Sequence, residues 1–212
     1  IIMFLENKYL KFAGLNLSIE TLEGLLKHNG PVEDLELVNS LIGVKNFKDM
    51  IKFNTYPSLE AQISAISDDI AYNNHDIQDG IKANLFKLEE LVEINFFRDI
   101  YKKYKKLINK RNYKIITYQI IRDSIDLMIK DLINNTKHNL KNNKIKSFRD
   151  INKTSFLMVN FSNKIKSSED EIRYFLRTKM YNNKNVLAKN NEGRSIVKKL
   201  FNNIKKNPKK FI

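Results

Sequence analysis

One stretch of this 212-residue chain, Ser58 to Gly80, constrains the fold more than any other. At about 100° per residue its apolar side chains fall within an arc of roughly 60°, and these are Leu59, Ile63, Ile66, Ile70 and Ile77. Polar side chains gather on the opposite side, in an arc of about 80° that holds Asp68, Tyr72, Asp76 and Asp79. The stretch therefore predicts a long helix with one packed face and one face that presents carboxylates and a phenol.

The polar face of this predicted helix carries no basic residue. No Lys or Arg occurs between Lys52 and Lys82, although the chain contains 38 of them. Acidic stripes usually face water, but carboxylates on successive turns repel one another unless a positive charge lies between them. Ala61 and Ala65 also leave room beside Tyr72. We therefore weigh a bound cation or polar ligand on this face equally with plain solvation.

Composition favours an all-α fold. The chain has 3 Pro, 6 Gly and 42% hydrophobic residues, and 3.6-residue periodicity recurs along it. It has no Cys, which suits a reducing compartment, and we expect a cytoplasmic protein.

No apolar run approaches 18 residues, so we expect neither a membrane span nor a membrane partner. The chain begins with Ile1, as a fragment that starts partway through a helix would.

The net charge of +14 indicates attraction to polyanions, so nucleic acid is a possible partner. The abundance of Lys, Asn and Ile is equally typical of an AT-rich genome, which produces Lys-rich surfaces without a selected partner. Charge alone therefore leaves both interpretations open.

Helix start and stop signals give the expected elements. Ser18 is the expected N-cap of a helix whose buried side holds Leu22, Leu25 and Leu26, and Asn29-Gly30-Pro31 ends it. Residues 141–153 are expected to form a loop, and a capping box at Ser168 to start a helix. The expected helices, in order, are a helix end at 1–12, then 19–28, 33–41, 58–80, one or two short helices in 85–107, 113–140, 168–181 and 193–206.

Motifs of the common nucleotide-binding and hydrolytic enzymes are absent, since the sequence has no P-loop, GxGxxG, GxSxG or HExxH. The three His residues are too few for an all-imidazole metal site. The dipeptide His75-Asp76 could be read as a pair of metal ligands, but a polar surface pair explains it as well.

Three segments carry a resemblance to a known family: GLNLSIETLEGLLKHNGP, SLEAQISAISDDIAYNNHDIQDG and FLRTKMYNN. They resemble the bacterial deoxyguanosinetriphosphate triphosphohydrolase-like proteins of the HD superfamily. The resemblance implies an oligomeric helical hydrolase that cleaves a deoxynucleoside triphosphate into deoxynucleoside and triphosphate. It also implies a divalent metal, Mg²⁺ or Mn²⁺, held by a His, a His-Asp pair and a distant Asp. Residues 1–110 would be the C-terminal part of the phosphohydrolase domain, and residues 111–212 a helical region packed on it.

Matched residue by residue, the resemblance implies roles for five side chains. Asp68 would be the distant metal ligand, and Tyr72 and Asp76 would hold the deoxyribose and its 3′-hydroxyl. Lys27 would lie close to the phosphates, where an ammonium offsets their charge. His28 stands where many relatives have Tyr, and its role in substrate binding follows less directly.

The family's metal-binding His and His-Asp pair match no residue of this chain, and no catalytic residue is carried over. One carboxylate cannot hold a catalytic metal, which typically needs about three protein ligands. The resemblance therefore implies the C-terminal part of such an enzyme, inactive by itself. Two alternatives stay open: a non-enzymatic basic helical module that binds nucleic acid or nucleotide, and a decayed remnant without function.

Overall fold

The computed structural model describes residues 2–36, 38 and 50–211. Within these ranges the regular structure is helical and no strand occurs; one isolated bridge joins Asn7 and Gly14. The all-α prediction is confirmed. None of the described helices combines the length and the apolar character that crossing a bilayer requires.

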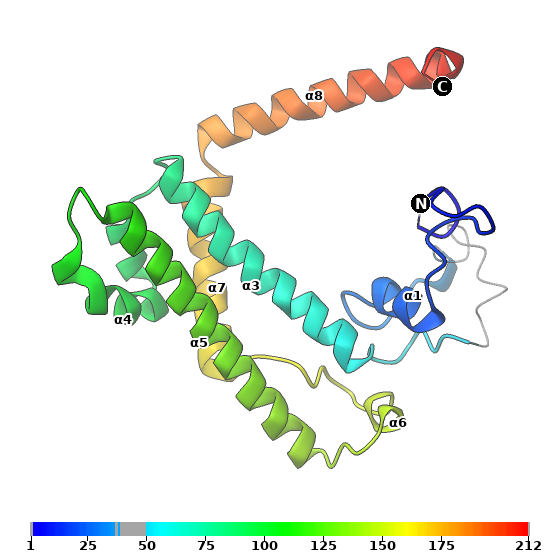
Figure 1. Ribbon diagram of the computed structural model, residues 1–212, viewed down its shortest axis with the longest axis horizontal. Helices are drawn as coiled ribbons and strands as arrows, with labels where there is room; N and C mark the ends of the chain where they lie inside the picture. The colour runs from blue at the N-terminus through cyan, green and yellow to red at the C-terminus, as the bar shows by residue number, and fades with distance from the viewer. Residues whose placement is uncertain (1, 37, 39–49, 212) are drawn as a thin grey trace. The chain divides into compact units, whose positions relative to one another are not determined.

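Figure 1 labels the main helices in chain order. The α-helices are α1 (Ile19–Leu26), α3 (Leu59–Lys82), α4 (Asn95–Tyr104), α5 (Tyr113–Asn142), α6 (Phe148–Ile151), α7 (Asn163–Leu176) and α8 (Lys184–Lys206). Shorter turns of 3₁₀ helix are η2 (Leu88–Glu93), η3 (Lys105–Leu107) and η5 (Pro208–Lys210). A π-helical turn, η4 (Arg177–Tyr181), follows α7. The expected helix at 33–41 falls partly outside the described residues.

The chain divides into two compact units, residues 1–70 with 128–162, and residues 71–127 with 163–212. The predicted division at residue 110 concerns family domains and stays a prediction.

In the first unit, α1 begins at the predicted residue, Ile19, and ends at Leu26, two residues before the predicted end at residue 28. The Ser18 hydroxyl accepts a hydrogen bond from the Thr21 amide, and Gly30 takes the left-handed conformation with φ 109°. A methyl group added at Gly24 would lie 3.1 Å from the Ala61 side chain, so α1 packs closely on the start of α3. Ile51 and Phe53 form a small core with Ile19, Leu26, Val32 and Val38.

The start of α3 is fixed by a buried amide that the sequence did not single out. The Gln62 side chain donates to the Pro57 carbonyl at 2.8 Å and accepts from the Val159 amide at 3.0 Å. The segment around Val159 is held in turn by α5, because Asp131 accepts two bonds from Ser162. These buried and partly buried polar contacts connect α3, α5 and the loop before α7 within the first unit.

In the second unit, α3 continues through Gly80 and ends at Lys82, so the predicted end at Gly80 is wrong. Gly80 is buried, and a methyl group there would lie 2.3 Å from the ring of Phe86. The missing side chain of Gly80 therefore allows α3 to pack closely against Phe86, and the helix does not end there. Phe86 meets Phe175 of α7 edge to face, with 4.9 Å between ring centroids.

Several other local predictions are corrected. Residues 2–12 form turns and not a helix end, and the expected loop at 141–153 contains α6. Ser168 lies inside α7 and donates to the Lys164 carbonyl, because the helix already starts at Asn163. α8 begins nine residues before the predicted start at 193. Two side chains assigned to the packed faces are exposed instead: Leu25 and Ile63.

Candidate functional site

The three residues of the 58–80 stretch to which the resemblance gives a role all lie in α3. Asp68, Tyr72 and Asp76 lie on successive turns of one uninterrupted helix, and steps of four residues turn the helix by only about 40°. Asp68 is exposed, 63% of the Tyr72 surface is accessible, and Asp76 is partly buried. Ile70 and Ile77 are buried. A phenol open to solvent and two carboxylates are therefore available to a ligand along this side of the helix.

Asp76 has a partner that sequence reasoning missed. The hydroxyl of Tyr181, in the π-helical turn after α7, donates a short hydrogen bond to Oδ2 of Asp76. Partial burial and then the bond to Asp76 raise the pKa of Tyr181 to about 12, although 44% of its surface remains exposed. The available signal was the segment FLRTKMYNN, which contains Tyr181 but had no role attached to it.

Lys27 lies in the first unit, at the end of α1, and is fully buried. Its ammonium donates to Glu23 Oε1 at 2.5 Å and to Thr55 Oγ1 at 2.9 Å. A buried ammonium needs such partners, because an unpaired charge away from water is costly. The structure thus brings Lys27 together with Glu23 and Thr55, and its predicted role beside phosphates stays a prediction.

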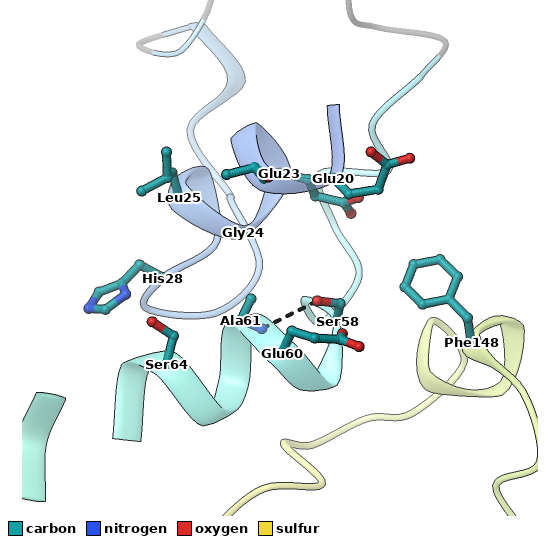
Figure 2. A pocket seen from close by; sticks show the side chains of 11 residues that line it. Glu20, Glu23, Gly24, Leu25, His28, Ser58, Glu60, Ala61, Ser64 and Phe148 are labelled. Carbon is teal, nitrogen blue, oxygen red and sulfur yellow. Dashed lines mark hydrogen bonds between the residues drawn. The ribbon is translucent and has the colours of Figure 1, made fainter. Parts of the chain in front are cut away.

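His28 forms part of the wall of a pocket of about 640 Å³ in the first unit (Figure 2). The pocket lies between α1, the first turns of α3 and Phe148 of α6. Its walls carry three carboxylates and three hydroxyls, from Glu20, Glu23, Glu60, Thr21, Ser58 and Ser64.

The charge of this pocket selects against phosphate. The backbone amide of Glu20 and then the Ser18 hydroxyl hold the pKa of the Glu20 carboxyl below its usual range, which favours the charged form. Glu23 is already paired with Lys27. A pocket with this lining suits hydroxyl groups or cations better than anions.

A divalent metal does not fit the donor set of the described residues alone. No group of three or more His, Cys, Asp or Glu side chains is close enough to hold a metal ion within residues 2–36, 38 and 50–211. Asp68 offers one carboxylate, whereas a catalytic metal typically takes about three protein ligands. No chemical step through a metal follows from these residues.

Comparisons with known proteins find similarity along the whole chain. Residues 159–212 match the family described as "Phosphohydrolase-associated domain". The chain is 64% identical over its full length to a protein of Pelagibacter ubique (strain HTCC1062), of which it covers 57%. It is 36% identical over 98% of its length to one from Bartonella quintana (strain Toulouse), covering 53% of that protein. A protein of Rickettsia typhi is 33% identical over 95% of the chain, and 52% of it is covered.

All three relatives carry the name "Deoxyguanosinetriphosphate triphosphohydrolase-like protein". The chain spans about half the length of these curated relatives.

Proposed function

We propose that this chain, which belongs by sequence with the deoxyguanosinetriphosphate triphosphohydrolase-like proteins of the HD superfamily, forms part of a nucleotide hydrolase. A phosphohydrolase role is supported by the names of its relatives and by the phosphohydrolase-associated domain. The finer proposal is hydrolysis of a deoxynucleoside triphosphate, of the dGTP kind, to deoxynucleoside and triphosphate. The absence of Cys fits our proposal of a cytoplasmic location.

The observation that carries this proposal is the arrangement of Asp68, Tyr72 and Asp76 along α3. The exposed ring of Tyr72 can stack against a sugar, and the Asp76 carboxylate can accept a hydrogen bond from a hydroxyl. Asp68 can supply one oxygen to a hard divalent cation, Mg²⁺ or Mn²⁺. The remaining ligands would come from other protein residues, and we propose a homo-oligomer as the working form.

Lys27 and His28 take different parts in this proposal. Lys27 could offset phosphate charge only if its ammonium left Glu23 and Thr55, so the geometry favours a role in holding the end of α1. His28 faces a pocket rich in hydroxyls and carboxylates, where its ring can contact the sugar or base of a nucleotide.

The test replaces the matching segment of the Pelagibacter ubique relative by this chain. With Mg²⁺ or Mn²⁺ and each of the four deoxynucleoside triphosphates, we expect the chimera to release triphosphate, measured by ion-exchange chromatography. Asp68→Asn and Asp76→Asn should lower the rate by about 10²-fold or more, the scale of losing one preorganised polar group. The 212-residue chain alone should release none, because no group of carboxylates and imidazoles among its described residues can hold a metal ion.

Asp79→Asn is the matched control, since Asp79 lies on the same helix but is paired with Lys82. It should leave the rate close to that of the unmodified chimera. A folded chimera that releases no triphosphate from any substrate, beside an active parent, would contradict the proposal.

A second candidate function, a basic module that binds nucleic acid, is favoured by the C-terminal residues. Residues 184–212 carry nine Lys or Arg and one Glu, a net charge of +8 out of the +14 of the whole chain. α8, which makes up most of this segment, has no buried residue. Its side chains are therefore available to a polyanion without any rearrangement of a core.

A further inference from the structure

We infer that the second half of α8, residues 194–206, is a helix that lies along the surface of a membrane rich in anionic phospholipid. The inference goes beyond the proposed function and does not depend on it, since none of these residues lies in α3. It departs from our expectation of no membrane partner, which rested on the lack of a long apolar run. A helix in the membrane interface needs one apolar side and no such run.

The apolar side chains of residues 194–206 share one side of the helix. At about 100° per residue they fall within an arc of roughly 140° that contains no polar side chain of this segment, and they are Ile196, Val197, Leu200, Phe201 and Ile204. Between 39% and 67% of the surface of each is accessible, and α8 has no buried residue. Contiguous exposed apolar patches of this kind mark sites of interaction with proteins or membranes.

The other side of the same segment is cationic. Residues 194–206 contain no Asp or Glu, and their five cations all lie outside the apolar arc: Arg194, Lys198, Lys199, Lys205 and Lys206. Arg194, Lys198 and Lys205 border the edge of the arc next to Phe201. Long basic side chains in such positions cover apolar surface with their methylene groups and extend their charge to the lipid headgroups. These cations would therefore meet the headgroups when the apolar side lies against the membrane.

The apolar side distinguishes between the polyanions that this charge would attract. A nucleic acid would contact the cations through its phosphates and would leave the five apolar side chains in water. A second copy of α8 would cover the apolar side but would bring five more cations beside the first five. An anionic membrane accommodates both sides, because its headgroups attract the cations and the acyl chains below them receive the apolar side chains. The observations therefore favour the membrane.

The experiment measures the flotation of the 212-residue chain with lipid vesicles in a density gradient, titrated with lipid. The chimera with the Pelagibacter ubique relative is measured in the same way. Vesicles of phosphatidylcholine and phosphatidylglycerol in equal parts should bind both proteins. Vesicles of phosphatidylcholine alone should bind them at least about tenfold less tightly, because each Lys near an anionic surface contributes roughly a fivefold gain.

Val197→Ser combined with Phe201→Ser tests the apolar side. Ser has nearly the same helix propensity as Val and Phe, and neither side chain is buried in a core, so the helix should persist by circular dichroism. Binding to the mixed vesicles should fall by about tenfold or more, because burial of a side chain of this size contributes roughly that factor. The matched control, Asn191→Ser with Asn202→Ser, changes residues outside the apolar arc and should leave binding unchanged.

A second variant, Lys198→Gln with Lys205→Gln, keeps every apolar side chain and covers the case that the Ser substitutions disrupt the helix. It should lower binding to the mixed vesicles by roughly tenfold or more. Binding to vesicles of phosphatidylcholine alone should not change, because these carry no net charge for the lysines to meet.

Three results would overturn the proposal. The chain may not bind the mixed vesicles at all is excluded by the first measurement: absence of flotation, with or without binding of single-stranded DNA, contradicts a membrane partner. Undiminished binding of the helical Val197→Ser, Phe201→Ser variant would show attraction by charge alone. Binding by the chain but not by the folded chimera would show that other residues of the whole protein cover the apolar side. A chimera that binds the mixed vesicles but releases no triphosphate would contradict the proposed function and support this one.

Discussion

At the scale of single residues, Lys27 shows how a side chain proposed for ligand binding can have another partner in the fold. Its position at the end of α1, just before Gly30, allows either a solvent-exposed ammonium that faces an anion or a buried one that needs a carboxylate. The structure has the second arrangement, because Glu23 lies one helical turn earlier and Thr55 approaches from the segment before α3.

Replacing Lys27 by Met should therefore destabilise the first unit. Loss of the ammonium leaves the Glu23 carboxylate, whose side chain is only 16% exposed, without its cation. Breaking a fully buried pair costs about 3–5 kcal/mol, and partial exposure of Glu23 should reduce the loss to about 1–3 kcal/mol. Urea unfolding followed by circular dichroism measures this change.

The control for this prediction is Lys52→Met, which removes an exposed ammonium and should change the free energy of unfolding by less than about 0.5 kcal/mol. Glu23→Gln combined with Lys27→Met should recover part of the loss. An unchanged stability of Lys27→Met, together with weaker binding of dGTP, would instead support the contact with phosphates that the resemblance implies.

At the scale of helices, the sequence predicted the existence of the main elements better than their ends. The periodicity of Ile70 and Ile77 located α3 correctly, because a long amphipathic pattern has few other solutions. The capping signal at Ser18 was also correct, since its hydroxyl accepts a bond from the Thr21 amide. The same type of signal was wrong at Ser168, which lies inside α7 and not at its start.

The contacts of the candidate site required the fold. The spacing of Asp68, Tyr72 and Asp76 can be read from the sequence because all three lie on one helix. The partner of Asp76 could not be read in this way, because Tyr181 follows it by 105 positions and reaches it through a π-helical turn. Such a turn has no simple sequence signal. The burial of Lys27 likewise depends on a contact with Thr55, 28 positions later.

Close packing of Gly80 in α3 against the Phe86 ring predicts the effect of a Gly→Ala substitution there. In an exposed helix, Gly→Ala stabilises by about 0.5–1 kcal/mol through helix propensity. At Gly80 the added methyl group would meet two atoms of the Phe86 ring at 2.3 and 2.4 Å. Overpacking of this kind costs about 1–3 kcal/mol, so Gly80→Ala should destabilise the second unit by about 1–2 kcal/mol in urea unfolding.

Gly193→Ala is the matched substitution, because Gly193 lies within α8 and no atom approaches its added methyl group within 4 Å. It should be neutral or slightly stabilising. If Gly80→Ala stabilised the protein as much as Gly193→Ala, the close contact of α3 with Phe86 would not exist in solution.

At the scale of the whole molecule, the uneven distribution of charge separates the two candidate functions. Excluding residues 184–212, the chain has 29 basic and 23 acidic residues, a net charge of +6, against +8 for the C-terminal 29 positions. Apart from Val186, residues 184–211 are exposed, and several apolar side chains of α8, among them Val197 and Phe201, are exposed with the lysines. A nucleic acid would therefore bind mainly through this segment.

Binding to a fluorescent single-stranded DNA at several salt concentrations tests this second function. Each phosphate that a Lys neutralises contributes about 0.7 to the slope of log K against log salt. Replacing Lys198, Lys199, Lys205 and Lys206 by Gln should therefore reduce the slope by roughly 2 to 3. Gln at Lys102, Lys103, Lys105 and Lys106 removes the same charge elsewhere in the chain and should reduce it by less than about 1. Equal reductions of the slope by the two sets of substitutions would indicate attraction by net charge alone, which needs no binding surface. A slope near zero for the unmodified chain would exclude the nucleic-acid function and would leave the proposed nucleotide site on α3 unaffected.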